Sequence, residues 1–268
     1  MLDAIRQIFR PKPKPTRPHP AIPGGQRIYA IGDIHGRKDL FDQLLQAIED
    51  DDRSRDKAET TIILLGDLID RGPDSSGVIA AARDLQTRRS TRIIAGNHEE
   101  MFLDSLENVD TLRHFLRFGG RETVLSYPVD RALFDTLTVE QTQAAMRKAV
   151  PAADIEFLQG LEDRITIGDY LFVHAGIRPG IPLQEQDLRD LRWIREPFLS
   201  HGEEHGWCVV HGHTITDAPE VRHNRIGIDT GAYMSGRLTA LGLEETGRWL
   251  IETGHTGGTA IHDIRENA

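Results

Sequence analysis

The chain has 268 residues, of which 38% are hydrophobic and 28% charged, and its formal net charge at pH 7 is -10. This composition is typical of a globular protein with a core of its own, and the acidic balance argues against a general nucleic-acid surface. One cysteine excludes an intrachain disulfide, and we find neither a run of about 18 apolar residues nor a signal-peptide core, so we expect a cytoplasmic protein without a membrane span.

The first 26 residues differ in composition from the rest of the chain. A short amphipathic start is followed, from Pro11 to Pro23, by a basic stretch that is rich in proline. Because proline removes backbone donors and blocks regular structure, we predict a flexible arm over residues 1–26. Its amphipathic start leaves weak contact with a membrane or a partner protein as a second interpretation.

After residue 26 the pattern alternates between strands and helices. Short apolar runs predict buried strands, and each run is followed by apolar residues at helical spacing. This alternation is typical of βαβ units and a parallel sheet. We expect the strands over residues 28–31, 61–65 and 92–95, and the helices over residues 37–50, 75–88 and from 98 onward.

The second half of the chain changes character twice. Residues 107–163 are polar with helical periodicity, and we interpret them as a helical cap insertion. A hairpin signal at Gly168 and Asp169 then opens a β-rich region. The two halves together predict an α/β fold with two packed sheets and helices outside. The main domain is expected over residues 27–254 and a loose tail over 255–268, with strands over 165–167, 170–173, 207–210, 225–229, 238–243 and 248–251.

Five short clusters of Asp, Asn and His end predicted strands. In an α/β sheet, functional groups gather in the loops beyond the carboxyl ends of the strands, so we expect these side chains to meet. Carboxylate, amide and imidazole ligands suit Mn²⁺, Fe or Zn²⁺ better than Ca²⁺. The clusters are GDIHG at 32–36, GDLIDRG at 66–72, GNHEE at 96–100, HAG at 174–176 and HGHT at 211–214.

These clusters predict a centre for two divalent metal ions. Asp67 can bridge both ions with its two carboxylate oxygens. Two divalent ions that face only two carboxylates leave the site net positive, which suits a phosphate dianion. We predict Mn²⁺ in both positions, with Fe or Zn²⁺ as alternatives. The first ion is assigned to Asp33, His35 and Asp67, and the second to Asp67, Asn97, His174 and His213.

The same motifs resemble the phosphoprotein phosphatase family of the calcineurin-like metallophosphoesterases, from about residue 27 to about residue 243. The resemblance implies an αββα sandwich with two mixed sheets. It implies a catalytic domain over 27–254, and hydrolysis of a phosphate ester by direct attack of a metal-bridging hydroxide. It also implies that His98 protonates the leaving oxygen and that Asp70 orients His98. Phosphate binding is implied for Arg71, Asn97 and Arg195, and a salt bridge with Glu196 is the alternative for Arg195.

The leading function at this point is a bacterial-type serine/threonine protein phosphatase that acts on phosphoproteins or phosphopeptides, with phosphotyrosine as a further substrate. The alternative is a hydrolase of dinucleoside polyphosphates such as diadenosine tetraphosphate. That branch of the family commonly carries Ala at the position of Asp70 and reads GNHD. A nucleoside diphosphate leaves readily, so Asp70 beside His98 favours an alkyl ester with a poor leaving group. A metal-bound scaffold without activity is the third interpretation, and the complete ligand set opposes it.

Two further histidine motifs receive no role. The last cluster reads His-Gly-His, where eukaryotic members of the family commonly carry Arg-Ala-His, so His211 matches no family residue. The pattern His201 to His205 fits a zinc-protease motif, but the glycines around it oppose the long helix which that motif needs.

Overall fold

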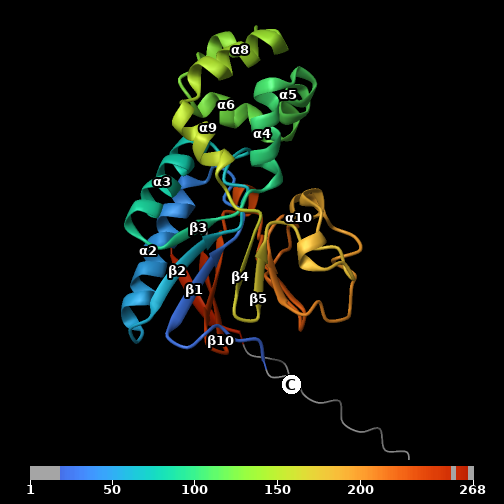
Figure 1. Cartoon of the computed structure of the whole chain (residues 1–268). Helices are drawn as coiled ribbons and strands as arrows, with labels where there is room; N and C mark the ends of the chain where they lie inside the picture. Colours follow the sequence, from blue (N-terminus) through green and yellow to red (C-terminus); the bar gives the residue numbers. More distant parts are fainter. Residues whose placement is uncertain (1–18, 255–257, 265–268) are drawn as a thin grey trace, which may run out of the picture.

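The computed structural model describes residues 19–254 and 258–264, so the amphipathic start predicted for the arm lies outside the described residues. Two mixed β-sheets lie face to face, with helices on both outer sides (Figure 1), as predicted. In chain order, the larger sheet contains β1 (Gln26–Ile31), β2 (Glu59–Leu64), β3 (Thr91–Ile93), β9 (Thr239–Glu244), β10 (Gly247–Thr253) and β11 (Thr259–Asp263). The smaller sheet contains β4 (Arg164–Ile167), β5 (Tyr170–Val173), β6 (Cys208–His211), β7 (Glu220–Val221) and β8 (Arg225–Gly227).

Each sheet contains both parallel and antiparallel pairs of strands. The larger sheet has the order β11-β10-β9-β1-β2-β3 and the smaller one β4-β5-β6-β8-β7. β1, β2 and β3 are parallel, as the βαβ pattern predicts, and so are β5, β6 and β8. β4 and β5 form the predicted antiparallel hairpin. The carboxyl ends of both parallel sets therefore lie at one end of the sandwich.

The alternation of side chains along β1 explains the layers. Tyr29 and Ile31 point to α2 (Lys38–Ser54) and α3 (Ser75–Arg88), whereas Ile28 and Ala30 point to the second sheet. The second sheet alternates in the same way, because Tyr170 and Phe172 face the first sheet while Leu171 and Val173 face α10 (Leu188–Trp193). Figure 1 shows α2 and α3 on one outer side and α10 on the other.

A group of helices stands on the end of the sandwich that carries the loops (Figure 1), and we call residues 97–159 the helical lobe. Leu112, Phe115 and Met146 of this lobe belong to the same buried core as α2 and α3, so the lobe has no separate core. Residues 107–163 are thus mostly helical, as predicted. The lobe comprises α4 (Asn97–Glu107), α5 (Val109–Phe115), the π-helical turn η1 (Leu116–Gly120), α6 (Arg121–Ser126), α7 (Arg131–Phe134), α8 (Val139–Ala149) and α9 (Ala152–Gln159).

The end of the predicted arm is ordered, contrary to the prediction for residues 1–26. Ile22 is 2% exposed and packs between the two sheets, and its N–H donates to the carbonyl of Glu245. Ala21 exchanges hydrogen bonds with Asp169 at the hairpin turn. One buried isoleucine in a proline-rich stretch is too weak a pattern to reveal this contact.

The predicted loose tail over 255–268 is wrong for residues 259–263. These residues form β11, which pairs antiparallel with β10. All five side chains of β11 are exposed, so this edge strand is held by backbone hydrogen bonds and carries no apolar pattern.

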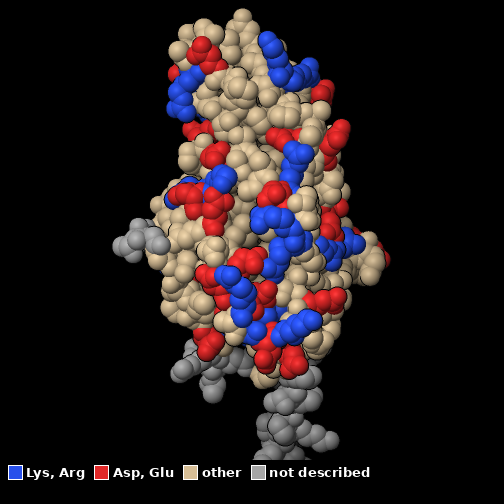
Figure 2. Space-filling model, turned by 90° about the vertical axis from the view of Figure 1, so that its left-hand side faces the viewer, with Lys and Arg blue, Asp and Glu red and all other residues tan. Residues whose placement is uncertain are grey.

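The charged surface is mixed. Figure 2 shows acidic and basic side chains interspersed over the face on which α2 and α3 lie. Arg89, for example, is paired with both Glu49 and Asp52. Among the described residues, no helix is both long enough and apolar enough to cross a membrane.

Candidate metal centre

The loops at the carboxyl ends of five strands bring the predicted ligands together. β1, β2 and β3 of one sheet and β5 and β6 of the other end at the same side of the sandwich. The exposed fraction of every predicted ligand is 8% or less, so these polar side chains need partners inside the protein. The ligands are Asp33, His35, Asp67, Asn97, His174 and His213.

Backbone strain is concentrated at this site. Six residues other than glycine have a positive φ in the described part of the chain, and five of them lie here; the sixth is Glu245 in a hairpin turn. Such conformations are costly and persist where the surrounding structure holds them, which is typical of functional sites. The five residues are His35, Asp67, Asp70, Arg71 and His213, with φ values of 46°, 49°, 74°, 67° and 63°.

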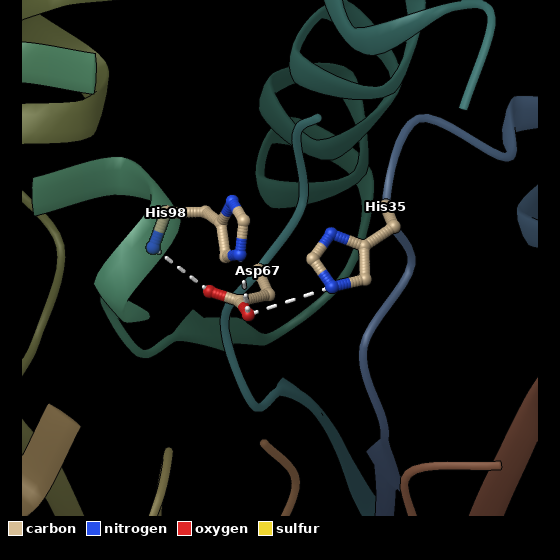
Figure 3. A group of neighbouring side chains, drawn as sticks. All are labelled: His35, Asp67 and His98. Atoms are coloured by element: carbon tan, nitrogen blue, oxygen red, sulfur yellow. Dashed lines mark hydrogen bonds and ion pairs between the residues drawn. The ribbon is translucent and has the colours of Figure 1, made fainter. Parts of the chain in front are cut away.

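Asp67 lies at the centre of the site. Its Oδ2 is 3.5 Å from Nε2 of His35 and 3.9 Å from Nε2 of His98 (Figure 3), and its Oδ1 is 3.5 Å from Nε2 of His174. Two groups of side chains have ligand atoms within 4.8 Å of one another, namely His35 with Asp67 and His98, and Asp67 with His174 and His213. Because both groups share Asp67, the geometry fits a carboxylate that bridges two ions.

The tautomers of two histidines fit metal binding. Nδ1 of His35 lies 2.8 Å from the carbonyl of Ile69, and Nδ1 of His174 lies 2.8 Å from the carbonyl of Leu65. A carbonyl only accepts, so both Nδ1 atoms carry the proton. The lone pairs on Nε2 therefore face Asp67, and such backbone contacts are the usual way in which proteins orient histidine ligands.

Asn97 provides a second test of fit. Its Oδ1 is 3.0 Å from Nε2 of His174 and 2.9 Å from Nδ1 of His213. The lone pair of His174 thus faces an amide oxygen that also only accepts, and a cation between them would satisfy both atoms. Nε2 of His213 is buried and has no hydrogen-bond partner among residues 19–254 and 258–264. The donor set around Asn97 therefore suits a metal ion.

Asp33 lies against the loop of the last cluster rather than inside either ligand group. Both of its oxygens accept the N–H of His213 at 3.1 Å, and a Cβ at Gly212 would lie 2.0 Å from its Oδ1. Burial, Asp229 and Asp67 raise the pKa of Asp33 well above its usual value. Three buried carboxyl groups in one place are a further reason to expect cations here.

His98 and Asp70, the two residues of the predicted acid pair, are in contact. Nδ1 of His98 is 2.5 Å from Oδ2 of Asp70, and both side chains are buried. Burial acts to lower the pKa of His98, but the carboxylates of Asp67 and Asp70 outweigh it and raise that pKa. Burial lowers the pKa of His35 and of His174. These opposite shifts make His98 more readily protonated than His35 and His174.

Arg71 points into the site from the loop after β2. Its NH1 is 2.7 Å from Nε2 of His35, and its NH2 is 2.9 Å from Nε2 of His98. The guanidinium carbon lies 4.9 Å from the ring centroid of Tyr233, which sequence reasoning did not select. A planar cation in this position can bind phosphoryl oxygens next to His98.

Arg195 lies at the exposed edge of the site. Burial and His174 lower the pKa of His213 to about 3, and the charge of Arg195 adds to this shift. Glu196, the alternative partner of Arg195, accepts a hydrogen bond from Ser200. Phosphate binding by Arg195 stays a prediction.

Glu99 supports the site and was missed. Its carboxylate accepts the backbone N–H groups of Gly96, Asp67 and Leu68 at 2.8, 2.9 and 2.8 Å. Burial and the nearby charge of Asp67 raise the pKa of Glu99 to about 7. A glutamate three residues after a helix N-cap is a capping signal, and this signal was available in the sequence.

The histidines without a predicted role lie beside the site. His211 is buried, and its ring packs edge-on against Phe198 at 5.1 Å between centroids. His205 packs on the same phenylalanine. Neither belongs to the two ligand groups found among the described residues.

A protein-family model described as calcineurin-like phosphoesterase matches residues 26–256. A serine/threonine-protein phosphatase 1 from Salmonella typhimurium is 28% identical over 222 residues, which cover 80% of this chain and 90% of the relative. A symmetrical bis(5′-nucleosyl)-tetraphosphatase from Nitrosospira multiformis is 26% identical over 284 residues and covers 87% of this chain and 98% of its own. Asymmetrical tetraphosphatases match at similar identity, one of them from Halalkalibacterium halodurans.

Solved structures show the same fold. A structure provisionally named a diadenosine tetraphosphatase has a TM-score of 0.57 at 19% identity, over 93% of this chain and all of that one. A cold-active protein-tyrosine phosphatase from a Shewanella species has a TM-score of 0.54 at 18% identity, over 90% of this chain and 83% of that one.

Proposed function

Because the chain belongs to the family of calcineurin-like phosphoesterases, with residues arranged to bind metal ions, we propose that it removes phosphate from phosphoserine and phosphothreonine in proteins. The observation that carries this proposal is the hydrogen bond of 2.5 Å between His98 and Asp70. A serine or threonine alkoxide is a poor leaving group, and a positioned proton donor accelerates its departure. Phosphotyrosine, whose phenolate leaves more readily, is a further substrate in this proposal.

Two divalent ions would be held by the six predicted ligands, and Mn²⁺ is our proposal for both because carboxylate, amide and imidazole donors are mixed. The proposed ligands of these ions are Asp33, His35, Asp67, Asn97, His174 and His213. When bound, such ions polarise the phosphoryl oxygens and supply an activated water at neutral pH.

Residues of the chain would then bind the phosphoryl group and protonate the leaving oxygen. Nδ1 of His98 is engaged by Asp70, so Nε2 is the atom that can deliver a proton. In this structure that Nε2 accepts a hydrogen bond of 2.9 Å from the guanidinium of Arg71, so it can carry a proton only when Arg71 turns to the phosphoryl group. A phosphoryl group bound by Arg71, with Asn97 and Arg195 nearby, would place its leaving oxygen beside the proton donor.

Hydrolysis of dinucleoside tetraphosphates is the second candidate. It is favoured by the relatives that carry the name tetraphosphatase, which match this chain over as much of their length as the protein phosphatase does. The departing nucleotide is a weaker base than an alkoxide and needs an acid less. Asp70 and His98 therefore weigh toward the phosphoprotein.

The two candidates are separated by one assay. The full chain supplied with Mn²⁺ is tested on a phosphoserine peptide, a phosphotyrosine peptide and diadenosine tetraphosphate, and kcat/KM is compared. We expect the phosphoserine peptide to exceed the tetraphosphate by about tenfold or more, which corresponds to about 1.4 kcal/mol of transition-state stabilisation. A preference of that size for the tetraphosphate would reject the protein phosphatase.

We also propose a cytoplasmic location, in which a protein phosphatase meets its substrates without crossing a membrane. The single cysteine, Cys208, is buried and free, as is usual in a reducing compartment.

A further inference from the structure

The helical lobe holds the loop that carries Asp70 and Arg71. This loop runs from the end of β2 to the start of α3 and contains three of the strained residues, Asp67, Asp70 and Arg71. Three sets of contacts join the loop and the first turn of α3 to the stretch Gly119–Ser126 of the lobe. The N–H of Arg71 donates to the carbonyl of Gly119 at 3.0 Å, and the N–H of Ser76 donates to the hydroxyl of Ser126 at 3.0 Å. The third set involves Thr123.

Thr123 binds Asp70 through both its donor and its acceptor. The Thr123 hydroxyl donates to Oδ1 of Asp70 at 2.5 Å and accepts the N–H of Asp70 at 2.9 Å. Ser75 completes the group, because its hydroxyl lies 2.9 Å from that of Thr123 and 3.0 Å from the Asp70 nitrogen. Asp70, Ser75 and Thr123 each have an exposed fraction of 0%, so no solvent replaces these bonds.

The two oxygens of the Asp70 carboxylate are thus bound by two different helices of the lobe. Oδ1 is bound by Thr123 of α6, and Oδ2 is bound by His98 of α4. A carboxylate held at one oxygen only can rotate about its Cβ–Cγ bond, whereas a carboxylate held at both is fixed in orientation. Removal of the threonine hydroxyl would also leave a buried acceptor without its donor.

We propose that the helical lobe is a positioning element for the acid pair, and that Thr123 is the positioning residue that fixes Asp70 toward His98. This inference rests on the proposed function, in which His98 protonates the leaving group. The hydroxyl of Thr123 is bound to Asp70 and Ser75, so Thr123 acts through Asp70. Its loss should therefore matter most where a proton donor is most needed.

The test compares substrates that differ in their need for an acid. Thr123→Val keeps the shape of the side chain and removes the hydroxyl, and Thr123→Ser restores it. The control is Thr142→Val, which changes another buried threonine of the same lobe, in α8. Each full-length variant, supplied with Mn²⁺, is assayed on a phosphoserine peptide and on p-nitrophenyl phosphate, whose phenolate leaves unaided. Melting temperature and metal content are measured for every variant.

We expect Thr123→Val to lower kcat for the peptide by about tenfold more than kcat for the aryl phosphate, with KM changed less than about twofold. Thr123→Ser should recover most of this loss, and Thr142→Val should show no difference between the substrates. Should Thr123→Val fail to fold, Ser75→Ala weakens the same group, and we expect a substrate difference of about threefold from it.

Equal losses on both substrates would overturn the proposal, as would a loss that Thr123→Ser does not recover. Asp70→Asn, assayed in parallel, separates the two levels of inference. A substrate difference in Asp70→Asn without one in Thr123→Val rejects the positioning role alone. Equal losses on both substrates in Asp70→Asn would reject the acid pair itself, and the role of Thr123 with it.

Discussion

The metal side and the acid side of the site are held by different parts of the molecule. On the metal side, His35 and His174 are oriented by carbonyls of the loops at the ends of the strands, at Ile69 and Leu65. On the acid side, Asp70 is bound by Thr123 of the helical lobe. The strand-end loops thus orient two of the predicted metal ligands, while α6 of the lobe orients Asp70.

This division explains how one scaffold can serve several substrates. The strand-end loops lie on the rigid sandwich, where exposed fractions of the ligands are 8% or less. The stretch Gly119–Ser126 of the lobe contacts the loop of Asp70 and Arg71, so changes in this stretch can alter these two residues while the carbonyls of the strand-end loops still orient His35 and His174. Relatives named protein phosphatase and tetraphosphatase both match this chain over most of their length, which is consistent with such a division.

The largest effect is expected on the metal side, from Asp67→Asn. An amide cannot bridge two cations as a carboxylate does, so both ligand groups lose their shared member. We expect activity to fall by about 10³-fold or more, beyond the 10–100-fold typical of changes around metal ligands, and metal content to fall with it. Asp154→Asn, in a buried acid that binds Arg83 and Tyr127, is the control and should retain both ions. Two ions and full activity in Asp67→Asn would remove the bridging role.

The second largest effect is expected from His98→Ala, which tests whether His98 is the proton donor or a metal ligand. Its Nε2 lies 3.9 Å from Asp67, so it stands in a ligand group as well as in the acid pair. If His98 is the acid, His98→Ala should slow hydrolysis of a phosphoserine peptide by about 10²-fold or more, slow an aryl phosphate far less, and leave metal content unchanged. Loss of one ion, together with equal losses on both substrates, would move His98 to the metal side.

The same comparison separates what the sequence could predict from what it could not. The predicted ligands each stand within a few residues of a strand end, so local motifs and the rule for parallel sheets predicted that these side chains meet. The roles of Asp70, His98 and Arg71 came from the family resemblance. Thr123 lies 53 positions from Asp70, and a lone threonine inside a polar helix carries no signal of its own. Asp229, whose side chain bonds to Asp33, was likewise not selected as a site residue, because it is the last residue of a predicted strand.

The fold also contains elements that the sequence predicted and elements that it did not. Strands buried on both faces, such as β1 and β2, were predictable from continuous apolar runs. The edge strand β11 was not, because backbone pairing with β10 holds it and all its side chains are exposed. Ile22 shows that one buried side chain can order a proline-rich segment that looks flexible by composition.

Asp70→Asn should act on the acid side through His98. Asp67 and Asp70 both raise the pKa of His98, so loss of the Asp70 charge should lower that pKa. The protonated form of His98 is then lost at a lower pH, and the alkaline limb of kcat for the phosphoserine peptide should move downward, by about one pH unit. Metal content should not change. An unmoved alkaline limb, with both ions bound, would show that Asp70 does not tune His98.

Gly119→Ala tests whether the lobe also controls Arg71. Gly119 has a φ of 107°, and a Cβ there would lie 2.6 Å from Cγ of Arg71. We expect the displaced arginine to raise KM for small phosphate esters by about fivefold to tenfold, or about 1 kcal/mol of binding, while metal content stays constant. Gly25→Ala is a matched control, since Gly25 has a φ of 79° and nothing within 4 Å of its added Cβ. An equal rise in KM in both variants would assign the effect to backbone strain alone.

The smallest effect is expected from Arg195→Ala, at the exposed edge where neither the sheets nor the lobe encloses the side chain. Arg195 is close enough to contribute to the lowered pKa of His213, but it is exposed, so solvent and salt screen its charge. We expect KM for a phosphoserine peptide to rise by about threefold at low salt, and by less at about 0.5 M salt, with kcat nearly unchanged. Arg189→Ala, in an exposed arginine of α10, should change neither value. A fall in kcat as large as that of His98→Ala would instead place Arg195 on the reacting phosphoryl group, as a third side of the site supplied by the loop after α10.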